Sequence, residues 1–524
     1  MRIVFVIVSI CLCCSCGDRD LLDFDKMDKP QGWEPTFSFV LARGDFSMWD
    51  LLKESASDSA TLKKDENGQL LIEYKRPEIY TIGVDDLYSM KAEDMFFNGS
   101  FPINRSYIDA GKGTVQNPYY DTLRVPFQLE QLLPEVSIRE ATLSIKSMTF
   151  IVMNNANIGG TLTVVCENLY SLETGDKIAI PLTLTPGKPI TFYSTEVPNL
   201  KAVLNGSDIV PLTFVLKVTD IAQMQNNQNV LIDIATAGVD YKNVNLFLPS
   251  AEIPLPQKSF IPEIALLNDL SGDFEFVRPE LQITARTKGL GADFYLRPMV
   301  FTAVNAGKML QTDEVFGFAG ENQNVNEVCN NFSYDISNSN IQEFTDVWSG
   351  NKIEYGGGEL RYGGGEMWLY AGGKLIFDLT LKIPLELSAT ELVYYDTIRD
   401  LNLKNADKIL EARLRMVGEN GIQMEFGIPE VLLLDGNNGL LDRIANENPD
   451  LVFPAANEAG PANGSILIAF NEKNLRYLAK SKRIVLKIVA KSTPGKTAVI
   501  DAISRLTLRL NLEARVDMGG VVFD

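Results

Sequence analysis

Period-two alternation of apolar and polar residues is the feature that most constrains the fold of this chain. From Trp33 onward such runs recur between turns rich in Gly, Asn, Asp and Pro, for example Ile466-Leu-Ile-Ala-Phe470 and Leu506-Thr-Leu-Arg-Leu-Asn-Leu512. Successive side chains of a strand point to opposite faces, so these runs bury one face of a sheet and leave the other in water. The chain is therefore predicted to be mainly β, built from sandwich-like modules with a few short helices.

Local signals place those helices and one hairpin. Ser47–Glu54 carries Met48, Leu51 and Leu52 at helical spacing, and Asn67-Gly68 supplies the positive φ angles of a tight hairpin turn. Two further helices are expected, near Thr195–Leu204 and at Asn471–Ser481, the latter with Asn471 as N-cap.

Three short motifs recur in the same order at nearly the same offset, which indicates an internal duplication. The pairs are Tyr119-Tyr-Asp-Thr-Leu-Arg124 with Tyr394-Tyr-Asp-Thr-Ile-Arg399, Ile138-Arg-Glu-Ala-Thr-Leu143 with Ile409-Leu-Glu-Ala-Arg-Leu414, and Asn199-Leu-Lys201 with Asn474-Leu-Arg476. Two copies are too few for a solenoid, so we expect two related β-rich modules in tandem.

The same patterns divide the chain into five segments. We expect a signal peptide at 1–15, an acidic tether at 16–34, a first β-rich module with its lead-in at 35–257, an irregular insert rich in glycine and aromatic residues at 258–382, and a second β-rich module at 383–524. The boundary after the first module falls in a proline-rich stretch, residues 249–257, where prolines resist continuous strand pairing.

The amino terminus has the pattern of a secretory leader. Arg2 is followed by about ten apolar residues, too few to span a bilayer. They run into Cys11-Leu-Cys-Cys-Ser-Cys16, which resembles a bacterial lipoprotein signal. Cys16 is the expected lipid-modified residue; Cys14, Cys13 and a plain secretory signal are the alternatives.

A charged stretch with five aspartates follows, from Gly17 to Pro30, and is predicted to be a solvated tether. Acidic residues at this position resemble the surface-export signal of lipoproteins in the Bacteroidota. The resemblance favours the cell surface over an anchor that faces the periplasm.

Composition excludes several kinds of chemistry. The chain has no histidine, so Ser-His-Asp and Cys-His catalysis and histidine-ligated metals are ruled out. Only Cys166 and Cys329 lie beyond the leader, which leaves no disulfide framework, and both are expected to be non-catalytic. A net charge of −20 disfavours nucleic acid as a partner. No cofactor motif is present, and the acidic turn Asp435–Asp442 is read as a plain turn rather than a calcium site.

Aromatic residues in the insert form the one candidate binding site. They are interspersed with Glu354, Glu359 and Glu366, and comprise Trp348, Tyr355, Tyr362, Trp368 and Tyr370. Exposed rings beside carboxylates can bind a sugar, and two facing carboxylates can hydrolyse one, although the same rings also pack sheet cores. This binding site is therefore a hypothesis that depends on whether the aromatic side chains are exposed to solvent.

The leader, the tether, the Trp33-Glu-Pro35 opening, the Asp45–Leu52 segment and the duplicated β modules together resemble the large surface lipoproteins of the Bacteroidota. That resemblance implies a lipid anchor in the outer membrane, facing the cell exterior, and no particular activity. The leading hypothesis is a non-enzymatic binding, scaffold or adhesion module whose partner is a protein or glycan. The alternatives are a glycan-binding or glycan-hydrolysing protein and an apolar tunnel for lipid.

Overall fold

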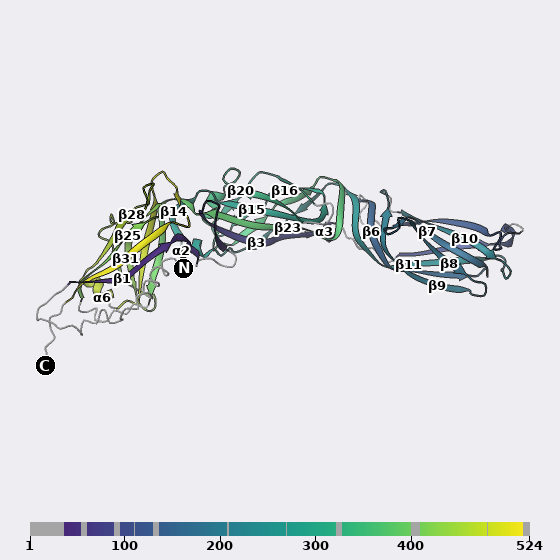
Figure 1. Ribbon diagram of the computed structural model, residues 1–524, viewed down its shortest axis with the longest axis horizontal. Helices are drawn as coiled ribbons and strands as arrows, with labels where there is room; N and C mark the ends of the chain where they lie inside the picture. The colour runs from purple at the N-terminus through teal and green to yellow at the C-terminus, as the bar shows by residue number, and fades with distance from the viewer. Residues whose placement is uncertain are drawn as a thin grey trace, which may run out of the picture.

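The computed structural model describes residues 36–53, 60–87, 95–108, 111–128, 136–206, 209–268, 270–320, 327–399, 409–478 and 480–516. Strands account for 67% of the described residues and helices for 5%, which confirms the mainly β class. The sheets form three sandwich-like modules that follow one another along the long axis of the molecule (Figure 1). We call them the base, middle and tip modules.

The tip module is made from one continuous stretch of chain. One of its sheets has the strand order β4-β11-β6-β9 and the other has the order β5-β10-β7-β8. The strands are β4 (Met95–Ile103), β5 (Tyr119–Gln128), β6 (Ser137–Asn154), β7 (Gly159–Ser171), β8 (Lys177–Leu184), β9 (Ile190–Val203), β10 (Ile209–Asp220) and β11 (Gln228–Leu248), with a 3-10 turn, η2 (Arg105–Tyr107).

The base module repeats this topology with strands from both ends of the chain. Its sheets have the orders β1-β31-β25-β28 and β24-β29-β26-β27, with β14 and β30 added beside β24. The elements are β1 (Thr36–Ser47), α2 (Met48–Lys53), β14 (Leu270–Phe276), β24 (Glu386–Arg399), β25 (Ile409–Asn420), β26 (Met424–Leu434), β27 (Leu440–Ala445), β28 (Ala462–Phe470), α6 (Glu472–Leu478), β29 (Arg483–Ser492), β30 (Ala498–Val499) and β31 (Arg505–Val516).

Strand register supports the duplication residue by residue. In the tip module Tyr120-Asp-Thr122 of β5 lies opposite Val215-Leu-Lys217 of β10. In the base module Tyr395-Asp-Thr397 of β24 lies opposite Val485-Leu-Lys487 of β29. The tripeptide Tyr-Asp-Thr therefore lies opposite the tripeptide Val-Leu-Lys in both modules.

The third motif of the expected duplication is not equivalent in the two modules. Asn199-Leu-Lys201 lies in β9, whereas Asn474-Leu-Arg476 lies in α6. The helix expected near Thr195–Leu204 is thus wrong. Val197 and Leu200 are both buried because β9 has a bulge there, with Asn199 at a φ of 51°, and the extra residue imitates helical spacing.

The other local predictions agree with the structure. α2 and α6 occupy the expected segments, and the Asn471 side chain accepts a hydrogen bond from the Asn474 backbone N–H at 3.0 Å. The expected hairpin joins β2 (Ala60–Lys64) to β3 (Leu70–Gly83) through residues 65–69, and of Asn67 and Gly68 only Gly68 has a positive φ, at 84°.

The segment expected to be an irregular insert, residues 258–382, instead forms ordered sheets in the middle module. This module also includes part of the expected lead-in, as β2 and β3. β2 and β3 form one sheet with β23, β15 and β20, and eight shorter strands form two small sheets. Strands of three to five residues are too short to show a periodic pattern in sequence. The elements are β2 (Ala60–Lys64), β3 (Leu70–Gly83), α3 (Val84–Leu87), β12 (Ala251–Pro254), β13 (Lys258–Phe260), α4 (Ala265–Asn268), β15 (Glu280–Gly291), β16 (Asp293–Arg297), β17 (Val300–Ala303), β18 (Lys308–Leu310), β19 (Phe316–Ala319), β20 (Val328–Tyr334), α5 (Ile341–Thr345), β21 (Ile353–Gly356), β22 (Glu359–Tyr362) and β23 (Gly365–Pro384).

Backbone hydrogen bonds link the middle module to the base module. The Leu385 N–H donates to Leu70 C=O at 2.7 Å, the Leu70 N–H to Ile500 C=O at 3.0 Å, and the Ile500 N–H to Leu385 C=O at 2.8 Å. All three residues are buried. This ring joins three distant segments at the junction between the two modules.

We expect the amide hydrogens of Leu70, Leu385 and Ile500 to exchange with solvent as slowly as those of the core strands, because opening the ring exposes buried polar groups. Hydrogen exchange read by mass spectrometry checks this, with Val115, which is 75% exposed, as the fast-exchanging control. Exchange at the ring as fast as at Val115 would contradict a tight junction.

Candidate functional site

Trp348 and Tyr355, two of the five candidate aromatic residues, lie in the core of the middle module. Trp348 is 0% exposed and Tyr355 is 3% exposed. Both rings pack against Phe260 and Phe301, with centroids 5.6 to 6.2 Å apart. The Tyr355 hydroxyl donates to Ile79 C=O at 3.2 Å. These rings are structural and do not face solvent.

Tyr362 is also buried, at 6% exposure, and packs on Phe294 with ring centroids 6.2 Å apart. Trp368 and Tyr370 differ, because they are only half-buried and lie on the same face of β23, where their rings stack at 6.1 Å. The five residues therefore do not form one surface. Three of them are buried in the core: Tyr355 and Tyr362 on the inward faces of β21 and β22, and Trp348 in the turn that follows α5.

The three glutamates of the hypothesis are engaged separately. Glu354 binds Lys352, and Glu359 binds Arg297 at 3.2 Å. Glu366 accepts hydrogen bonds from Arg139 at 2.8 Å and from Asn245 at 2.6 Å. Each carboxylate thus has its own basic partner.

Replacement of Trp348 by Ala should lower the free energy of unfolding by about 3–5 kcal/mol, because it empties a fully enclosed site. Trp368→Ala is the matched control and should lower it by less than about 1.5 kcal/mol, since it removes a half-exposed stacked ring. Urea denaturation followed by circular dichroism measures both. Equal losses would contradict the difference in burial.

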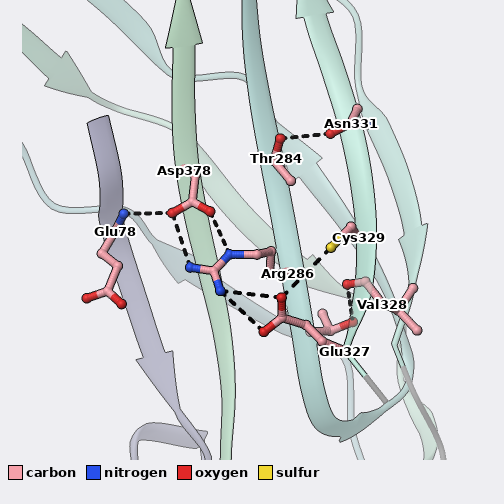
Figure 2. A network of polar contacts seen from close by, with 9 residues as sticks. Glu78, Thr284, Arg286, Glu327, Val328, Cys329, Asn331 and Asp378 are labelled. Atoms are coloured by element: carbon pink, nitrogen blue, oxygen red, sulfur yellow. Dashed lines mark hydrogen bonds and ion pairs between the residues drawn. The ribbon is translucent and has the colours of Figure 1, made fainter. Parts of the chain in front are cut away.

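An ionic network that the sequence did not suggest crosses the sheet of the middle module (Figure 2). Arg286 on β15 binds Asp378 on β23, with Nε 2.5 Å from Oδ2, and reaches Glu327 at 3.2 Å. Hydrogen bonding to Asp378 raises the pKa of the Arg286 guanidinium further above its ordinary value, although burial opposes the shift. The residues are scattered along the chain, so no local motif could reveal them.

The network also holds a strained turn of β3. The Glu78 backbone N–H donates to Asp378 Oδ1 at 2.8 Å, and Glu78 has a φ of 55°. The β3–β23 pairing shifts at the same place, between Phe377 and Leu379. Asp378 therefore supports a bulge and neutralises Arg286, which is a structural task.

The two cysteines among the described residues, Cys166 and Cys329, have opposite environments, as the sequence led us to expect for Cys166. Cys166 is buried in the tip module, and burial raises the pKa of its thiol to about 12. Cys329 is exposed beside Glu327, with its sulfur 3.9 Å from Glu327 Oε1.

Iodoacetamide at pH 8 should therefore modify Cys329 in the folded protein and leave Cys166 unmodified until the chain is unfolded, because alkylation requires an accessible thiolate. Peptide mass spectrometry distinguishes the two sites. Modification of Cys166 at the rate of Cys329 under native conditions would show that the tip module opens.

The tip module encloses an apolar space between its sheets. Leu143, Cys166, Leu212 and Ile234 contribute to its walls, and its volume is about 50 Å³. A space of this size holds only a few water-sized molecules and not a lipid chain. It therefore does not supply the continuous tunnel that the lipid hypothesis required.

Asp435 and Asp442 do not converge on a common point. Asp435 Oδ1 accepts the backbone N–H groups of Asn437 and Gly439, each at 2.7 Å, as in a plain turn. Asp442 instead accepts a hydrogen bond from Asn474 at 2.8 Å.

Cys16 and the tether lie outside the described residues. Within the described ranges, no helix is both long and apolar enough to cross a membrane.

Comparisons with known proteins add little. No protein-family model matches the chain, and no curated protein matches it. A predicted secreted protein of Parabacteroides distasonis is 13% identical, with a TM-score of 0.26, over 53% of this chain and 90% of its own. A chain from Sulfolobus turreted icosahedral virus is 10% identical, with a TM-score of 0.13, over 77% of this chain and 91% of its own. Likenesses this distant establish neither fold nor function.

Proposed function

We propose that this chain is a lipid-anchored protein of the outer membrane that holds its tip module away from the bilayer as a non-enzymatic binding, scaffold or adhesion module. The lipid sits on Cys16, the tether spans residues 16–34, and the protein faces the cell exterior. Its partners are the membrane, through the anchor, and a protein or glycan at the cell surface.

The observation that supports this proposal is the path of the chain. β1 pairs with β31 in the base module, so the first and last described strands lie at the same end of the molecule. The chain runs out through the middle module, builds the whole tip module, and returns. A lipid joined through the tether just before Thr36 attaches at the base module, and the tip module then lies farthest along the chain's axis from that attachment (Figure 1).

The strand pairing suits a spacer. β11, with 21 residues, pairs with β6 and β4 in the tip module and with β23 of the middle module. At about 3.3 Å per residue, one extended strand of this length reaches about 70 Å. Strands that belong to two modules resist bending between them.

Fewer aromatic residues support the glycan alternative than the sequence suggested. Trp368 and Tyr370 present a stacked, half-buried pair, and the nearby buried Asn245 Oδ1 has no hydrogen-bond partner within the part of the chain that the structure describes. The other three aromatic residues are in the core.

Cys16→Ser should abolish labelling with palmitate and release the protein from membranes. An epitope inserted at Gly175, in an exposed turn of the tip module, should bind antibody on intact cells carrying the unaltered leader and not on cells carrying Cys16→Ser. Cell fractionation and flow cytometry measure the two effects.

Cys329→Ser is the matched control and should change neither result. Palmitate labelling that survives Cys16→Ser would move the anchor to another leader cysteine. Antibody binding that requires permeabilised cells would overturn the cell-surface role.

A further inference from the structure

The first half of β9 is a bare sheet edge at the tip module. Residues 190–195 pair with β6 on one side, and no described strand pairs with them on the other, because β7 joins β9 only from Leu200 onward. Two large apolar side chains there are exposed, Ile190 at 52% and Phe192 at 71%. Unpaired backbone groups beside exposed apolar side chains form a template for another strand.

The other edges of the tip module carry a proline within the strand. β4 contains Pro102, β5 contains Pro126 and β8 contains Pro181. A proline lacks the N–H that strand pairing requires, so it protects an edge. In β9 the proline is Pro198, beyond the bare segment.

The duplicated base module shows how the equivalent edge is covered. β28 corresponds to β9, and residues 446–461 connect it to β27. That connection folds back over the edge, so that the Ser465 N–H donates to Val452 C=O at 3.3 Å. In the tip module the connection from β8 to β9 is only residues 185–189. The short connection leaves the β9 edge without such a cover.

Backbone direction shows which groups are available. The Asn154 N–H of β6 donates to Pro189 C=O at 2.8 Å, so the backbone of Pro189 faces β6. Because this direction alternates along an antiparallel strand, the N–H and C=O groups of Ile190, Phe192 and Ser194 point away from β6.

We propose that this edge pairs, antiparallel, with the same edge of a second copy, about a two-fold axis at Phe192. Phe192 then lies opposite its own counterpart, Ile190 lies opposite Ser194, and Lys188 lies opposite Glu196. In this arrangement the outward-pointing groups of Phe192 exchange both backbone hydrogen bonds with the second copy. Two-fold interfaces of this kind are the commonest in soluble oligomers.

Charge selects this alignment and this partner. Lys188 and Glu196 are both exposed, and neither forms an ion pair with another described residue. Lys188 lies two residues before β9, and its N–H donates to Thr185 C=O at 3.1 Å; the following Pro189 favours an extended conformation at Lys188. Each dimer gains two Lys188–Glu196 contacts, while repulsion between the net charges of −20 is screened beyond about 8 Å at physiological salt.

The antiparallel alignment also fixes how the long axes of the two molecules are oriented relative to each other. Strands of the tip module run roughly along the long axis (Figure 1), so antiparallel pairing points the two base modules in opposite directions. Two anchored copies paired in this way bridge facing surfaces. The bridging rests on the proposed function, whereas the pairing itself depends only on the tip module.

Light scattering after size exclusion of the full chain tests the pairing. The unaltered chain should form a concentration-dependent dimer, and Lys188→Glu or Glu196→Lys alone should weaken it by about tenfold, because each dimer then opposes two like charges. An equimolar mixture of the two variants, or the double variant, should restore the dimer. Recovery on mixing is a result that only this alignment between two copies gives.

Ile503→Lys is the control, because Ile503 is 82% exposed in the base module and should not affect the dimer. A chain that stays monomeric at every concentration, or a dimer that ignores both charge reversals, would overturn the proposal.

Bridging is tested with two populations of phosphatidylcholine vesicles that carry the lipidated full chain, one with Lys188→Glu and the other with Glu196→Lys. Clustering should occur only when the populations are mixed. Dimers in solution without clustering would overturn the bridging and leave the pairing intact, whereas failure of the vesicles to retain the chain would count against the anchor.

Discussion

The pairing of β11 with β23 is the constraint on which the extended form of this molecule depends. Six residue pairs, from Asn243 opposite Tyr370 to Leu248 opposite Gly365, continue the hydrogen-bonded ladder from the tip module into the middle module. Both strands also pair elsewhere, β11 with β6 and β23 with β3 and β15. Bending at this junction would break ladder hydrogen bonds whose groups cannot all be satisfied elsewhere. The two modules therefore share one continuous sheet.

The junction between the middle and base modules is held by different interactions. The ring of backbone hydrogen bonds among Leu70, Leu385 and Ile500 is short and buried, and the pair Arg278–Glu386 flanks it. The chain crosses this junction four times, between α2 and β2, between α4 and β14, between β14 and β15, and between β23 and β24. Out-and-back topology thus places both described ends together and makes the tip module a single uninterrupted insertion, which is why we assign the contact role to the tip.

The two duplicated modules share their strand order and differ in their connections. Equivalent positions such as Val215 and Val485 keep the same partners, since a shift by one residue would turn the buried face of the sheet outward. Connections are under no such constraint. The connection before β28 is long and lies against that strand, whereas the connection before β9 is short. Different exposed edges on the same scaffold are sufficient to give the two modules different roles.

By itself, the sequence determined the strand-rich class, the duplication, the short helices α2 and α6, and the excluded histidine chemistry, because all of these follow from local periodicity or from composition. It could not distinguish Trp348, which is buried in the core, from Trp368, which is half-buried on β23, since an aromatic residue suits either environment. It also suggested a helix where β9 has a bulge, and gave no sign of the Arg286–Asp378–Glu327 network. Those features were decided only by the tertiary structure, because burial, strand edges and ion pairs depend on which distant segments lie side by side.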